Sequence, residues 1–67
     1  MSAPANLDQV IHDLRNPLNN ISMYAELGKM QAQQGATAEK LLQTFETIVA
    51  QCQRCSSLLE ELKQNTN

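Results

Sequence analysis

Sixty-seven residues leave room for one small domain, which excludes a large enzyme with its own substrate cleft. Two aromatic residues and a net charge of -2 argue against a surface that stacks bases or neutralises nucleic-acid phosphates. The sequence contains no apolar stretch of about 18 residues and does not begin like a signal peptide. We therefore expect a cytoplasmic protein that binds neither nucleic acid nor membrane.

Apolar side chains recur at alternating steps of four and three from residue 7 onward, which predicts a helix over about residues 6–33. The main stripe consists of Leu7, Ile11, Leu14, Leu18, Ile21 and Ala25. A second row, Val10, Pro17 and Tyr24, repeats every seven residues and widens the apolar face. Asn6 is expected to cap this helix, with Gln9 closing a capping box.

A turn is predicted at residues 34–37 and a second helix over about residues 38–64. Gly35 is suited to the left-handed conformation that ends a helix, and Thr37 to capping the next one. The second helix repeats the four-three alternation. Its apolar positions are Leu41, Phe45, Ile48, Cys52, Cys55, Leu59 and Leu62, broadened by Leu42, Val49 and Leu58.

Two helices joined by a short turn form an antiparallel hairpin, so residues 1–67 are predicted to be a single all-α domain. A lone hairpin cannot cover two broad apolar stripes. Pairing two hairpins into a four-helix bundle would bury both and supply the core that a short chain lacks. The periodicity therefore predicts a homodimer.

One segment breaks the amphipathic pattern, because it contains the only histidine of the chain and a proline inside a predicted helix. The heptad positions direct His12, Asn16 and Asn19 away from the bundle axis. Pro17 removes a helical hydrogen bond to the carbonyl of Asp13 at a cost of about 3 kcal/mol, so we expect a bend there. Such local violations are typical of functional sites.

The segment His-Asp-Leu-Arg-Asn-Pro-Leu-Asn-Asn-Ile, beginning at His12, resembles the H-box of sensor histidine kinases. That motif belongs to their dimerisation and histidine-phosphotransfer domain, and the similarity extends over nearly the whole chain. In this family the domain is a dimeric four-helix bundle, which the periodicity also indicates.

The resemblance implies a role for each motif residue. His12 matches the phosphoacceptor, and Asp13 matches the acid that activates or orients the imidazole. Asn16 matches the position that places water for dephosphorylation of a bound response regulator, and Arg15 would supply positive charge near the phosphoryl group, or pair with a surface carboxylate. The response regulator would dock just beyond the histidine, at Asn19, Asn20, Ser22 and Met23.

The expected partners are a second copy of the chain, a response-regulator receiver domain and the ATP-binding domain of a histidine kinase. With only Gly28 and Gly35, the chain has no glycine-rich segment to cradle phosphates. We therefore expect it to bind no cofactor itself and not to phosphorylate itself, with ATP and Mg²⁺ supplied by partner domains. It would be either a fragment of a larger kinase or a free-standing phosphotransfer module.

Two alternatives stay open at this point. Cys52 and Cys55 lie on the core stripe, where small apolar filling is favoured over a metal site, because zinc would need four ligands. For the chain as a whole, the alternative function is a non-catalytic helical protein that keeps the H-box and regulates histidine kinases by binding or mixed dimerisation.

Overall fold

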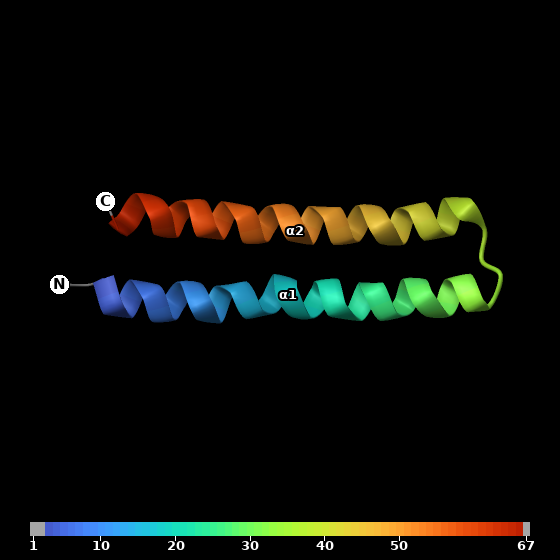
Figure 1. The fold of residues 1–67 in the computed structure, drawn as a ribbon, viewed down its shortest axis with the longest axis horizontal. Helices are drawn as coiled ribbons and strands as arrows, with labels where there is room; N and C mark the ends of the chain where they lie inside the picture. Colours follow the sequence, from blue (N-terminus) through green and yellow to red (C-terminus); the bar gives the residue numbers. More distant parts are fainter. Residues whose placement is uncertain (1–2, 67) are drawn as a thin grey trace.

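The protein is a hairpin of two long antiparallel helices, as the sequence predicts (Figure 1). The computed structural model describes residues 3–66. Helix α1 spans Ala3–Gln33 and helix α2 spans Ala38–Thr66. The two helices lie side by side along a molecule of 53 × 15 × 8 Å, with both ends of the chain at the end opposite the turn (Figure 1).

Helix α1 begins at Ala3, so the predicted start at Asn6 and the predicted capping box are wrong. The amides of a first helical turn have no carbonyl partner, so a proline at position 4 does not prevent an earlier start. The side chain of Asn6 lies outside the described residues. Gln9 Nε2 donates to Asp13 Oδ1 at 2.9 Å, because side chains four residues apart meet on a helix.

The turn between the helices has the predicted chemistry. Gly35 adopts a φ of 77°, and its amide donates to the carbonyl of Ala32 at 3.2 Å, while the Ala36 amide donates to the carbonyl of Gln31 at 2.8 Å. This pair of bonds is the Schellman arrangement, which satisfies carbonyls at the end of α1. Thr37 Oγ1 then accepts a hydrogen bond from the Lys40 amide at 3.2 Å and caps α2.

The contact between the helices draws on both apolar rows of α1. Val10 and Pro17 are buried, Leu14, Ile21 and Tyr24 are half-buried, and α1 stays helical through Pro17. A Cβ added at Gly28 would lie 3.4 Å from Thr44 Cγ2, so the helices approach closely there. Thr44 is buried, and its hydroxyl donates to Gln31 Oε1 at 2.7 Å, which links the two helices through a polar pair.

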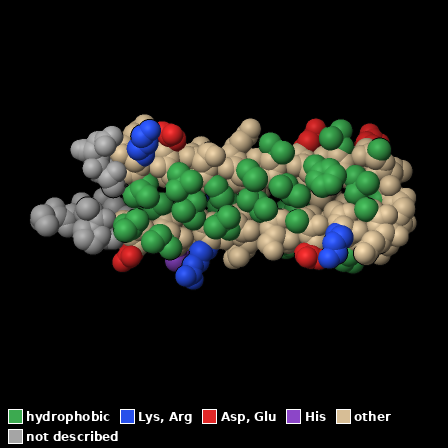
Figure 2. All heavy atoms as spheres, in the orientation of Figure 1, with side chains coloured by type: hydrophobic (Ala, Val, Ile, Leu, Met, Phe, Trp, Pro, Cys, Tyr) green, Lys and Arg blue, Asp and Glu red, His purple; other side chains and the backbone are tan. Residues whose placement is uncertain are grey.

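The exposed members of the main stripe of α1 and a matching row of α2 together form an apolar flank (Figure 2). Its members are between 45% and 56% exposed: Leu7, Ile11, Leu18, Leu42, Phe45, Val49 and Leu59. These residues recur at helical spacing, and the space-filling view shows apolar side chains running along both helices (Figure 2). A single hairpin therefore leaves this face uncovered.

Neither α1 nor α2 contains, within its described residues, a segment apolar enough to cross a membrane.

Candidate functional site

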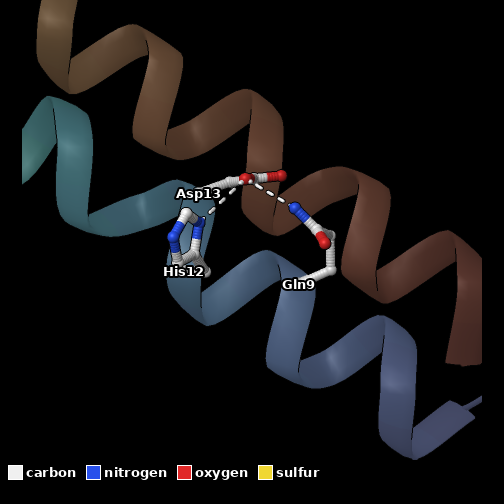
Figure 3. A network of polar contacts seen from close by, with 3 residues as sticks. All are labelled: Gln9, His12 and Asp13. Carbon is white, nitrogen blue, oxygen red and sulfur yellow. Dashed lines mark hydrogen bonds and ion pairs between the residues drawn. The ribbon is translucent and has the colours of Figure 1, made fainter.

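The histidine of the motif stands on the surface of α1, as the heptad pattern predicts. Its side chain is 82% exposed. Asp13 Oδ1 lies 3.7 Å from His12 Nδ1, which is within ion-pair range but longer than a hydrogen bond (Figure 3). The same carboxylate oxygen accepts the hydrogen bond from Gln9 Nε2 (Figure 3). Gln9 and Asp13 thus form a polar pair on one side of the imidazole.

This arrangement separates the two nitrogens of the ring. Nδ1 is the nitrogen directed at Asp13, so Nε2 lies across the ring from the carboxylate (Figure 3). A carboxylate beside Nδ1 favours the tautomer that carries its proton there, which leaves the lone pair on Nε2. The site can therefore present an unprotonated ring nitrogen to an electrophile arriving from solvent.

A chain of polar contacts connects Asn16, one turn beyond the histidine, with helix α2. Asn20 Nδ2 donates to Asn16 Oδ1 at 3.3 Å and to Gln51 Oε1 at 3.2 Å. Gln51 Oε1 also accepts from Arg54 Nη1 at 3.4 Å. These bonds run from α1 across the hairpin to α2, so the position of Asn16 depends on both helices.

His12, Asp13 and Asn16 share a shallow cavity of about 230 Å³ with two side chains of α2. Those side chains are Arg54 and Leu58. The cavity brings the three predicted catalytic residues together and adds a cation and an apolar wall from the second helix.

The remaining predicted residues divide between the two sides of α1. Asn19 and Met23 follow His12 and Asn16 at steps of three and four, so they lie on the same row of the helix, and both are exposed. Asn20 is half-buried and turned toward Gln51. Ser22 follows Leu18 by four residues, so it lies beside the apolar flank instead.

Arg15 is exposed one turn from His12 and does not line the cavity. Its predicted place near a phosphoryl group rests on the motif alone, whereas Arg54 reaches the cavity from α2.

Several side chains on the row of His12 or beside its cavity were not predicted as site residues. Leu27 and Met30 continue the row that starts at His12, and both are exposed apolar side chains. Their four-three spacing from Met23 is visible in the sequence and could have identified them. Gln51 and Arg54 carry no such signal, because the contact of Gln51 with Asn20 and the place of Arg54 in the cavity depend on the register between the helices.

The two cysteines are free, with Cys52 exposed and Cys55 half-buried. Cys52 lies seven residues from both Phe45 and Leu59, so it belongs to the apolar flank and is not a core residue of the single hairpin. Its predicted burial would require a partner. Among the described residues, no group of three or more His, Cys, Asp or Glu side chains is placed to hold a metal ion.

Comparison with known protein families gives a match over most of the chain. Residues 7–65 match the model of the His Kinase A (phospho-acceptor) domain. No curated protein and no solved structure matched the chain. The matched segment contains the whole cavity around His12 and both faces of the hairpin.

Proposed function

Because the chain belongs to the His Kinase A (phospho-acceptor) domain family, we propose that His12 is its phosphoacceptor in two-component signal transduction. In this proposal His12 exchanges a phosphoryl group with the ATP-binding domain of a histidine kinase or with an aspartate of a response-regulator receiver domain. The observation that carries it is the 82% exposed imidazole whose Nδ1 faces Asp13, which leaves Nε2 for the reaction.

The proposed phosphoryl transfer has two steps, and in each step one bond to phosphorus forms while another breaks. In the uptake step the Nε2 lone pair attacks phosphorus and an N–P bond forms. The bond from phosphorus to the leaving oxygen of the donor breaks, and its electron pair departs on that oxygen. In the return step a carboxylate oxygen of the receiver attacks phosphorus, the N–P bond breaks, and its electron pair returns to Nε2.

Asp13 supports this chemistry by holding the ring and its charge. While Nε2 carries the phosphoryl group and Nδ1 its proton, the imidazole is cationic, and the carboxylate oxygen 3.7 Å away stabilises that charge. Gln9, bonded to the same oxygen at 2.9 Å, limits the orientations that the carboxylate can take. Asn16 would orient water for dephosphorylation of a bound regulator. ATP and Mg²⁺ would come with the partner domains.

A second copy of the chain is the proposed cover of the apolar flank. Seven large apolar side chains there are roughly half exposed in the single hairpin. A symmetric pair of hairpins would bury both flanks against each other and complete a four-helix bundle. His12 lies on a different side of α1 from Ile11 and Leu18, so it would stay accessible in such a dimer.

The proposed docking surface for a receiver domain is the row of α1 that continues from His12 through Asn19 and Met23. Leu27 and Met30 extend it toward the turn, and their exposed apolar side chains suit a transient interface. Asn20 would contribute by holding Asn16 rather than by direct contact. Docking along this row would bring a receiver carboxylate to His12.

The test is phosphorylation of the purified full chain, with labelled ATP and a histidine-kinase ATP-binding domain, or with labelled phosphoramidate as a small donor. We expect acid-labile label on the wild-type chain and none on His12→Ala. Gln43→Ala, at an exposed position of α2 that does not line the cavity around His12, is the control for loss of one polar side chain. Absence of label on the wild type with every donor would refute the proposal and favour a non-catalytic protein that acts by mixed dimerisation.

A further inference from the structure

The cavity beside His12 contains one side chain with a permanent positive charge, and it comes from the helix that does not carry the histidine. Of the five lining residues, Asp13 is acidic, Asn16 and Leu58 are neutral, and Arg54 is a guanidinium. Arg54 is exposed, so its charge can reach a group that occupies the cavity from solvent.

Arg54 is held toward α1 by a contact that continues across the hairpin. Its Nη1 donates to Gln51 Oε1 at 3.4 Å, and the same oxygen accepts from Asn20 Nδ2 at 3.2 Å. One acceptor therefore ties the guanidinium to an α1 side chain that also bonds Asn16. This bond uses one of the five N–H groups of Arg54, which leaves donors in the planar fork for an anion.

A phosphoryl group on His12 would need such a donor. Its oxygens carry about two negative charges. Arg54 lines the same cavity as His12, so its guanidinium can offset part of this charge and donate to two oxygens at once, a geometry that matches guanidinium to phosphate. Arg15 does not line this cavity, although it is the cation that the motif points to.

We propose that Arg54 is a catalytic residue that binds the phosphoryl group on His12 from the opposite helix, with Gln51 positioning its guanidinium. This inference rests on the proposed role of His12 as phosphoacceptor. It implies that the phosphoacceptor site is complete only when α1 and α2 are packed in their native register.

The experiment compares the initial rates at which the full chain takes up label from phosphoramidate. In this reaction the P–N bond of the donor breaks, its electron pair leaves with ammonia, and an N–P bond to His12 forms. We expect Arg54→Ala to lower the rate about three- to tenfold, since the site is open to solvent, and Arg54→Lys to recover part of the loss. The difference should shrink as salt rises.

Two controls separate this role from a structural one. Lys29→Ala removes an equal charge from an exposed position more than four helical turns from His12, and should keep the wild-type rate. Diethyl pyrocarbonate, an uncharged reagent that acylates imidazole, should modify His12 equally fast in the wild type and in Arg54→Ala. A defect confined to the anionic donor supports the proposal.

Two results would overturn the inference alone. They are an unchanged uptake rate in Arg54→Ala, and equal losses toward phosphoramidate and diethyl pyrocarbonate. Both leave the phosphoacceptor role intact, because the wild type still takes label on His12. A wild type that reacts with diethyl pyrocarbonate but takes label from no donor would instead refute the proposed function.

Discussion

The two exposed sides of helix α1 differ in chemistry although neighbouring residues of one short segment supply both. Ile11 belongs to the apolar flank, and His12, the next residue, begins the row that continues through Asn16 and Met23. Consecutive residues are about 100° apart around a helix, so one element can serve two surfaces. Both residues are exposed in the single hairpin, so exposure alone does not distinguish a surface that needs a partner from one that needs access.

Helix α2 contributes differently to the apolar flank and to the side of the hairpin that carries His12. On the apolar flank, Phe45, Val49 and Leu59 extend the same kind of surface that α1 presents. On the side that carries His12, α2 contributes the guanidinium of Arg54 to the cavity, and α1 contributes no arginine or lysine there. The apolar flank is thus repetitive and suited to self-association, whereas the other side is a local site assembled from unlike groups.

The largest expected effect comes from placing a charge on the apolar flank. Phe45→Glu would put two carboxylates into a symmetric interface and remove two phenyl groups, each worth about 1.5–3 kcal/mol when buried. We expect at least roughly a hundredfold weaker dimer by sedimentation, together with a lower unfolding temperature.

The matched control for this change is Gln43→Glu. Gln43 is exposed two residues away on α2, and it lines a cavity near the turn with Gln31 and Lys40 rather than lying on the apolar flank. It should leave the dimer intact. Two results would contradict the assignment of the apolar flank to self-association. One is a wild-type chain that sediments as a stable monomer, and the other is an equal loss of dimer affinity in the two variants.

A smaller effect, confined to chemistry, is expected from Asp13→Asn. The substitution keeps the size of the side chain but removes the charge 3.7 Å from His12 Nδ1. We expect the rate of phosphoryl uptake to fall about ten- to a hundredfold with no change in sedimentation. Glu26→Gln removes an equal charge from an exposed position of the same helix, nearly four turns from His12, and should leave the rate near that of the wild type. Comparable losses in both variants would reduce Asp13 to one of several surface charges.

The sequence predicted most of the fold because the hairpin depends on local signals. Gly35 and Thr37 specify the turn through their own backbone and hydroxyl chemistry, and both act as predicted. The start of α1 was missed, since the first turn of a helix tolerates residues that break it elsewhere. That the interhelical contact draws on members of both apolar rows of α1 was also not predictable, because both rows have helical spacing and the register depends on close approach at Gly28.

The residues of the candidate site also differ in whether a local sequence pattern could identify them. His12, Asp13 and Asn16 lie within five residues of one another, so the motif indicates them together, and all three line one cavity. Gln51 and Arg54 are about forty residues away in the sequence. Their contacts with the site arise only from the pairing of the helices, and no local pattern reports that pairing.

The smallest expected effect compares two adjacent residues that the sequence assigned to the same docking surface. Met23 lies on the row of His12, whereas Ser22 lies beside Leu18 on the apolar flank. Using a receiver domain that takes label from the wild-type chain, we expect Met23→Ala to lower kcat/KM for transfer about three- to tenfold. Ser22→Ala should change it less than about twofold, and both variants should take up label from phosphoramidate normally. A larger loss of kcat/KM in Ser22→Ala than in Met23→Ala would place receiver docking on the apolar flank. The receiver domain and the second copy of the chain would then compete for the same surface.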